Sequence, residues 1–212
     1  YTFRVPDYVK KHRIYFSKNQ RGFGENALHA MWWKIFNEFR PKKVLEIGVY
    51  RGQVVSLWGL LSDKLNFDCE ITGISPFSSV GDDVSEYLKN LDYLEDTKFN
   101  IKKFTKNKIF LLQNFSNDEQ AIKYIVSNKW DLIYIDGSHD FDIALNDYKV
   151  CKDSLSPNGI IVLDDSSLYT NYKPTSFSFA GHPGPSKIAR DYAEIDMELI
   201  MSVGHNNVFR NK

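Results

Sequence analysis

The sequence predicts an α/β fold whose core is a doubly wound, mostly parallel sheet, with an antiparallel hairpin at the carboxyl end. Between residues 41 and 165, short apolar runs alternate about five times with segments of helical periodicity, which is the pattern of a parallel sheet with right-handed crossovers. Two of the apolar runs, at residues 131–136 and 160–163, end in carboxylates. Residues 197–203 and 207–210 form two further strand-like runs joined by a short turn that contains glycine.

Each element follows from local signals. Helices are expected where apolar residues recur at helical spacing, at residues 25–39, 52–65, 81–104 (with a surface excursion), 117–128, 143–155 and 186–192. Strands are expected at the short apolar runs, at residues 43–47, 69–75, 108–112, 131–136, 160–163, 197–203 and 207–210. In the helix at 117–128, the residues expected to face the core are Ala121, Ile122, Ile125 and Val126. Residues 166–185 are rich in Ser, Gly and Pro and are predicted to form a loop.

Size and composition fit one sizeable domain. The chain has 212 residues, of which 42% are hydrophobic, enough for a packed core. Its 27 basic and 27 acidic side chains cancel, so charge gives no argument for a nucleic-acid partner or an anionic membrane. No apolar run approaches the ~20 residues of a membrane span, and residues 1–16 show no signal peptide. Cys69 and Cys151 are expected to be reduced core thiols, and we therefore expect a cytoplasmic protein.

Carboxylates lie at the ends of two buried runs. Asp136 ends the run at 131–136, and Asp164 and Asp165 follow the run at 160–163. If the two strands are neighbours, these side chains converge on the carboxyl edge of the sheet, where open α/β sheets bind ligands. Three carboxylates in one place repel one another unless a cation lies among them, and Mg²⁺ is the usual partner of oxygen ligands. A structural alternative is that Asp164 and Asp165 cap the following turn.

The first strand runs into a glycine-containing turn that opens a helix, with Glu46, Gly48, Tyr50 and Gly52 at alternate positions. Glycines there allow the backbone to approach a ligand closely. The NAD fingerprint is not matched, because Tyr50 occupies the place of its second glycine. An acidic residue at position 46 suits a cationic or hydroxyl-bearing ligand instead.

Together these features resemble class I S-adenosylmethionine-dependent methyltransferases. Residues 135–141, followed by Asp147 and by the run at 159–165, are similar to the metal-assisted O-methyltransferase branch, which includes the catechol, macrolide-sugar and cephalosporin-type enzymes. The resemblance covers roughly residues 41 to 165. The amino-terminal helix and the residues after Ser167 are not covered by it. We expect residues 41–212 to form the S-adenosylmethionine-binding methyltransferase domain and residues 1–40 to be an extension whose helix packs on this core.

The resemblance implies S-adenosylmethionine as cofactor, and Asp136, Asp164 and Asp165 as ligands of Mg²⁺ or another divalent cation. The implied cofactor-binding residues are Glu46, Gly48, Tyr50, Gly52, Ser75, Asn114, Phe115 and Asp136. Ser75 stands where the family usually has an acid that binds the ribose. Asp82 or Asp83 in the following loop could take over that role.

The implied reaction is in-line methyl transfer to a hydroxyl group, with Asp136 and His139 as the catalytic residues. The imidazole of His139 is placed to act as general base, or alternatively as a hydrogen-bond partner of the site. His182 and His205 are expected on the surface of loops. The loop after the carboxylates offers an aromatic wall for a ring-shaped acceptor such as a sugar, formed by Tyr169, Tyr172, Phe177 and Phe179.

Two alternatives to a metal-assisted enzyme remain open from the sequence. One is a metal-independent methyltransferase in which Asp136 contacts the substrate. The other is a non-catalytic cofactor-binding or scaffold domain, which the departures at Tyr50 and Ser75 would suit. The expected partner is a small or saccharide-like acceptor, and a homo-oligomer is compatible with the sequence.

Overall fold

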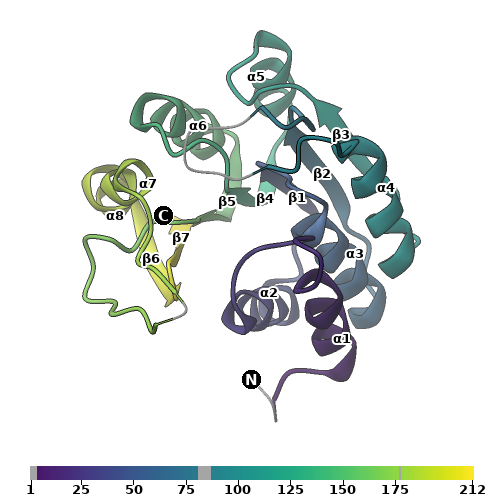
Figure 1. Cartoon of the computed structure of the whole chain (residues 1–212). Helices are drawn as coiled ribbons and strands as arrows, with labels where there is room; N and C mark the ends of the chain where they lie inside the picture. Colours follow the sequence, from purple (N-terminus) through teal and green to yellow (C-terminus); the bar gives the residue numbers. More distant parts are fainter. Residues whose placement is uncertain (1–3, 81–86, 177) are drawn as a thin grey trace.

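A seven-stranded sheet lies between two groups of helices in the computed structural model of the chain (Figure 1). The structure describes residues 4–80, 87–176 and 178–212. The strands are β1 (Lys43–Ile47), β2 (Glu70–Ser75), β3 (Ile109–Gln113), β4 (Trp130–Ile135), β5 (Leu155–Leu163), β6 (Met197–Val203) and β7 (Asn206–Asn211). The helices are α1 (Asp7–Phe16), α2 (Asn26–Phe39), α3 (Gln53–Leu65), α4 (Tyr93–Phe104), α5 (Glu119–Val126), α6 (Phe141–Asp153), α7 (Pro183–Ile188), the π-helical η1 (Ala189–Ala193) and α8 (Glu194–Asp196).

The sheet has the strand order β3-β2-β1-β4-β5-β7-β6. Strands β1 to β5 pair in parallel, whereas β7 runs antiparallel to both β5 and β6. The chain therefore winds outward in one direction from β1 to β3 and then in the other from β4. The crevice at this reversal, at the carboxyl ends of β1 and β4, is where sheets of this kind bind ligands.

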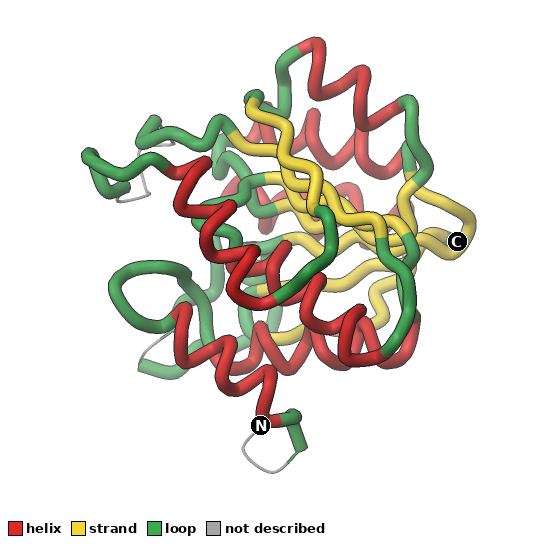
Figure 2. The backbone as a smooth tube through the Cα atoms, turned by 90° about the vertical axis from the view of Figure 1, so that its right-hand side faces the viewer, coloured by secondary structure: helices red, strands yellow, loops and turns green. Residues whose placement is uncertain are grey.

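Apolar strands are required because both faces of the sheet are covered. In β1, Val44 packs in the core on the side of α1 to α4, whereas Leu45 and Ile47 pack in the core on the side of α5 to α7. The two cores are separate clusters, and Figure 2 shows the twisted sheet between the two helical layers. Glu46 interrupts the apolar run of β1 on the same face as Val44, and its position matters for the site below.

The predicted fold class is confirmed, and most predicted strands and helices are found with shifts of a few residues at their ends. The helix predicted over residues 81–104 is found only from Tyr93 onward, residues 87–92 are not helical, and residues 81–86 lie outside the described residues. Strand β5 begins earlier than expected, at Leu155, and α7 begins at Pro183 in a stretch predicted to be loop. A proline is well suited to the first turn of a helix, because its missing N–H needs no partner there.

Two details of the sequence analysis were wrong or missing. Val126 does not face the core but is 54% exposed, because α5 turns only Ala121 and Ile125 fully inward. The sequence analysis did not predict α1, although its buried residues Val9, His12 and Phe16 have helical spacing. The division of the chain at residue 40 stays a prediction. Among the described residues, no helix is long and apolar enough to cross a membrane.

Candidate active site

Two cavities adjoin at the carboxyl ends of β1, β4 and β5. The first has a volume of about 470 Å³ and the second about 490 Å³, both in the range of small-molecule sites. Gly48, Tyr50 and Asp136 line both cavities, so the two spaces meet at these residues. A molecule in one cavity would therefore face a molecule in the other across Gly48 and Asp136.

Gly48 brings the end of β1 against the end of β4. Its φ is +96°, and a Cβ at this position would lie 1.7 Å from the carbonyl oxygen of Asp136. No other residue fits there without moving β4, so the glycine predicted for ligand approach also closes the sheet edge. Gly52, with φ of +81°, forms the amino-terminal cap of α3.

Glu46 is buried beneath this turn. Its Oε2 accepts a hydrogen bond of 2.9 Å from the backbone N–H of Val55, in the first turn of α3, and burial raises the pKa of Glu46 to about 8. Glu46 lines the second cavity. The structure thus places Glu46, predicted to bind the cofactor, on the second cavity and not among the lining residues of the first.

The first cavity extends from the β1 turn to the loops after β2 and β3. Ser75, at the end of β2, lines this cavity. Its carbonyl oxygen accepts a hydrogen bond of 3.1 Å from the backbone N–H of Asn114. Phe115 also lines it and is half exposed, whereas Asn114 donates its side-chain amide to Asp118 at 3.2 Å and lies behind the wall. Asp118, which the sequence analysis did not identify, lines the cavity. Asp82 and Asp83 lie outside the described residues.

Aromatic rings cover one side of the first cavity. Tyr50 lies 5.8 Å from Tyr87 and 5.6 Å from Tyr93 between ring centroids, and all three line the cavity. Tyr50 also lies 4.8 Å from Phe23, which lines the second cavity. The sequence analysis identified Tyr50 but not the other three, because their proximity depends on the packing of distant segments.

The second cavity contains the predicted carboxylates. Burial and the adjacent Asp164 carboxylate hold the pKa of Asp136 well above its usual range, and the two side chains share a hydrogen bond. Burial also acts to raise the pKa of Asp164. The hydrogen bond with His205 and the charge of His205 outweigh burial and bring the pKa of Asp164 below its usual value.

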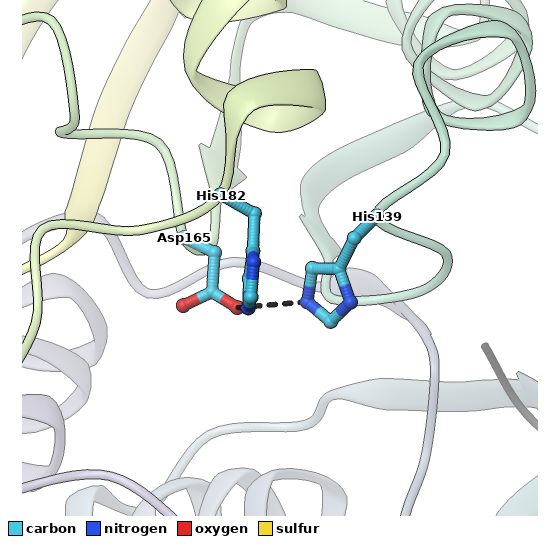
Figure 3. Close-up of side chains that lie close together, drawn as sticks. All are labelled: His139, Asp165 and His182. Carbon is cyan, nitrogen blue, oxygen red and sulfur yellow. Dashed lines mark hydrogen bonds and ion pairs between the residues drawn. The ribbon is translucent and has the colours of Figure 1, made fainter. Parts of the chain in front are cut away.

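Histidine side chains from separate loops lie beside the Asp165 carboxylate, and Figure 3 shows this for His139 and His182. His139 Nε2 lies 2.8 Å from Asp165 Oδ2 in a hydrogen bond, and His182 Nε2 lies 3.8 Å from the same oxygen. The rings of His139 and His182 are 4.1 Å apart between centroids. Asp165 has a φ of +50°, a left-handed conformation that Asp tolerates better than most residues.

His205 approaches the other oxygen of Asp165. Its Nε2 lies 3.3 Å from Asp164 Oδ1 and 3.7 Å from Asp165 Oδ1. Burial acts to lower the pKa of His205, but the two carboxylates outweigh it and raise this pKa to about 9. The expectation that His182 and His205 lie on the loop surface was wrong, because both line the second cavity.

The residues present fit a divalent cation. Ligand atoms of Asp164, Asp165 and His205 lie within 4.8 Å of one another, and so do those of His139, Asp165 and His182. Asp164 Oδ1 is buried and has His205 Nε2 beside it at 3.3 Å, and these are two atoms that one cation could join. The structure thus brings Asp164 and Asp165 together with histidines, and it places Asp136 beside Asp164.

Of the predicted aromatic wall, Phe179 lines the second cavity. Tyr169 is half exposed and packs its ring against Arg190 instead. Tyr172 contacts Ser178 through its hydroxyl at 3.3 Å, and Phe177 lies outside the described residues. Phe23 also lines this cavity and supplies an aromatic ring that the sequence analysis did not identify.

Comparison with known proteins decides the family. Residues 45–166, more than half of the chain, match the family model described as a methyltransferase domain. The chain belongs to this methyltransferase family. The resemblance found in the sequence is thereby confirmed.

One curated relative of this methyltransferase is an uncharacterized protein, R132, of Acanthamoeba polyphaga mimivirus. It is 28% identical over 149 residues, which cover 69% of this chain and 59% of the relative. The chain thus spans about three fifths of the length of the curated relative it matches.

Solved structures share the fold of the methyltransferase. The SAH-bound methyltransferase PaMTH1 of Podospora anserina has a TM-score of 0.66 at 17% identity, covering 98% of this chain and 89% of its own. A putative caffeoyl-CoA O-methyltransferase of Staphylococcus aureus has a TM-score of 0.64 at 15% identity, covering 96% and 91%. A structure described as cmcI-D160 Mg-SAM has a TM-score of 0.54 at 17% identity, covering 89% and 72%.

Proposed function

We propose that this methyltransferase transfers the methyl group of S-adenosylmethionine to a hydroxyl group of a small acceptor, assisted by a divalent cation at the ends of β4 and β5. The observation that carries the proposal is the junction of the two cavities at Gly48, Tyr50 and Asp136. A cofactor in the first cavity and an acceptor in the second would meet there, as in-line transfer requires.

The first cavity suits the cofactor. Gly48 allows close backbone approach, and the rings of Tyr50, Tyr87 and Tyr93 offer apolar and π surfaces to the nucleoside or the sulfonium. Ser75 and Phe115 also line this cavity, and we assign the ribose to Ser75 and the adenine to Phe115. The SAH-bound and SAM-bound neighbours support this choice of cofactor, since they share the fold.

The second cavity suits an acceptor with hydroxyl groups. Phe23 and Phe179 line it as aromatic walls, and the carboxylates and imidazoles supply polar partners at its base. A ring-shaped polyhydroxylated acceptor, such as a saccharide or a glycosylated metabolite, matches this combination of aromatic and polar surface. A divalent cation, when bound, would lower the pKa of an acceptor hydroxyl and orient it.

His139 is the proposed general base. Its Nε2 hydrogen-bonds to Asp165 at 2.8 Å, which assigns the Nε2–H tautomer and leaves Nδ1 as the basic nitrogen. Asp165 would stabilise the imidazolium that forms when His139 takes the acceptor proton. Asp136 stands at the meeting point of the cavities and would hold the acceptor beside the methyl group.

One observation favours a metal-independent enzyme as a second candidate. His205 already lies 3.3 Å from Asp164, and His139 hydrogen-bonds to Asp165 at 2.8 Å, so each carboxylate has a histidine partner without a cation. In that case Asp136 and the histidines alone would bind the acceptor. The cytoplasmic location and any homo-oligomer also stay predictions.

Calorimetric titration of the purified protein with S-adenosylmethionine, with and without divalent cation and chelator, tests the proposal. We expect cofactor binding in all conditions and a separate heat of metal binding that Asp164→Ala abolishes. Binding of cofactor without a metal effect would select the metal-independent enzyme. Absence of cofactor binding would contradict both candidates and favour a scaffold role.

A further inference from the structure

A histidine stands among the aspartates at the end of β5 and adds a nitrogen ligand to a site that the sequence predicted to be made of oxygens alone. His205 Nε2 lies 3.3 Å from Asp164 Oδ1 and 3.7 Å from Asp165 Oδ1. Ligands bound about 2.1 Å from one ion are about 3.0 Å apart at right angles and about 3.4 Å apart in a tetrahedron. The two distances to His205 are therefore close to those of ligands around one small divalent ion, and ligand atoms of all three residues lie within 4.8 Å of one another.

The fold holds His205 in this place. The turn between β6 and β7 is tied to the residue after Asp165, because Ser166 N donates to the carbonyl oxygen of His205 at 2.7 Å. The side-chain amide of Asn207 donates to Ser166 O at 3.1 Å and to Ser167 Oγ at 3.0 Å. His205 is 8% exposed and packs against the ring of Phe179. A ligand that is already fixed loses little freedom when the ion binds.

The histidines divide between the two oxygens of Asp165. His205 faces Oδ1, whereas His139 and His182 face Oδ2. An ion bound by His205 would thus use one oxygen of Asp165 and leave the hydrogen bond of His139 intact. The general base and the metal ligands are then different residues.

We propose that His205 binds the divalent cation together with Asp164 and Asp165, with Asp136 beside them, and that the site selects a first-row transition ion over Mg²⁺. This inference rests on the metal-assisted function proposed above. Mg²⁺ favours oxygen ligands in an octahedral shell, whereas imidazole suits transition ions, whose affinity for nitrogen-containing sites rises from Mn²⁺ through Co²⁺ toward Cu²⁺. One imidazole in a site otherwise made of carboxylates therefore shifts its metal preference from Mg²⁺ toward first-row transition ions.

Binding of Co²⁺ and of Mg²⁺ to the metal-stripped protein tests the inference. Calorimetry gives both dissociation constants, and the visible absorption of bound Co²⁺ reports a nitrogen ligand. We expect the wild-type protein to bind Co²⁺ on the order of 100-fold more tightly than Mg²⁺. His205→Gln should reduce this ratio at least about tenfold and change the Co²⁺ spectrum.

His182→Gln tests the competing cluster of His139, Asp165 and His182, because His182 faces the opposite oxygen of the same aspartate. This variant should keep the wild-type ratio and spectrum. Similar affinities of the wild-type protein for Mg²⁺ and Co²⁺ would overturn the inference while leaving a metal-assisted reaction in place, and this result needs no variant to fold. An unchanged ratio in folded His205→Gln would overturn it as well. If neither ion binds and methyl transfer is insensitive to chelator, the metal-assisted function fails together with the inference.

Discussion

Gly181 lies directly against the backbone of Asp165. A Cβ at position 181 would lie 2.0 Å from the carbonyl oxygen of Asp165, and the φ of Gly181 is +117°. His182 N donates to the same oxygen at 2.8 Å. This close contact therefore sets the distance between the loop that carries His182 and the strand end that carries the carboxylates.

Replacing Gly181 by alanine should lower the free energy of unfolding by about 2–3 kcal/mol, because the new methyl group meets backbone and the conformation is strained. Urea denaturation gives this difference. Gly204→Ala is the control, since Gly204 also has a positive φ of +63° but has room, with Tyr172 Oη 3.8 Å from the added Cβ. The free energy of unfolding of Gly204→Ala should fall by only about 1 kcal/mol. Equal losses for the two variants would contradict the close packing at Gly181.

His139→Ala should reduce turnover about 10²- to 10⁴-fold, because the variant lacks the group that takes the acceptor proton. Its affinity for the cofactor should be nearly unchanged, since His139 lines the second cavity and not the first. Steady-state kinetics and cofactor titration measure the two effects separately. Full activity of the variant would remove His139 from the mechanism.

Arg51 anchors the loop between α1 and α2, which carries Phe23 into the second cavity. Its guanidinium binds Asp96 through two hydrogen bonds of 2.6 and 3.0 Å and donates to the carbonyl oxygens of Asn19 and Gln20. Arg51 is buried, so Arg51→Met leaves the Asp96 carboxylate with the Asn100 amide but without its charged partner, and should destabilise the protein by about 3 kcal/mol.

The same variant should raise KM for the acceptor, because the wall formed by Phe23 loses its anchor. Arg190→Met is a suitable control: Arg190 pairs with Asp191 in an exposed position, where ion pairs contribute little to stability. Thermal denaturation and acceptor kinetics distinguish the two variants. Comparable stability of both would show that the Arg51 pair is not a structural anchor.

The sheet could be predicted because its signals are local. The alternation of apolar runs and helical periodicity fixes the order of the elements, and the positions of Glu46, Gly48 and Asp136 relative to the strand ends follow from it. Helix α1 was missed because its core positions include His12, a residue type that periodicity analysis counts as polar.

The rest of the site depends on contacts between distant segments. His205 lies about 40 positions after Asp165, and Phe23 about 27 before Tyr50. No local pattern indicates that the β6–β7 turn folds back onto the end of β5, or that the α1–α2 loop reaches the β1 turn. The local sequence feature that could have indicated these contacts is the stretch Gly181-His182-Pro183-Gly184. Its two glycines lie against the backbone of Asp165 and of His139.

His12 and His29 should make the protein sensitive to acid. Both are fully buried, with His12 Nδ1 3.0 Å from His29 Nε2 and His12 Nε2 3.0 Å from Ser56 Oγ. Burial lowers the pKa of His12 well below its usual value and that of His29 to about 3. Below pH about 6.5 the unfolded chain therefore binds protons that the folded protein does not.

Stability should consequently fall as the pH falls from about 6.5 toward 3, by up to about 1.4 kcal/mol per pH unit for each histidine. His29→Gln keeps a polar group beside His12 and should have a correspondingly smaller slope. Denaturant unfolding of both proteins between pH 7 and pH 5 measures the difference in slope, independently of other titrating groups. Identical slopes would show that His29 is protonated in the folded state.

Asp147 supports the first cavity without lining it. Its Oδ2 accepts a hydrogen bond of 2.9 Å from Ser116 Oγ, and Ser116 lines the cavity. Burial raises the pKa of Asp147 to about 7, so a neutral amide is a close substitute for this side chain. Asp147→Asn should keep the position of Ser116 and nearly the wild-type affinity for S-adenosylmethionine.

Asp147→Ala, by contrast, leaves the Ser116 hydroxyl without its partner and opens space beneath the loop that carries Phe115. We expect it to weaken cofactor binding about tenfold, which corresponds to about 1.4 kcal/mol. Calorimetric titration of both variants with S-adenosylmethionine measures this difference. Because neither substitution touches the cavity surface, a loss in the alanine variant alone means that Asp147 acts by holding Ser116 in place. Equal affinities in the two variants would mean that the loop keeps its position without this hydrogen bond.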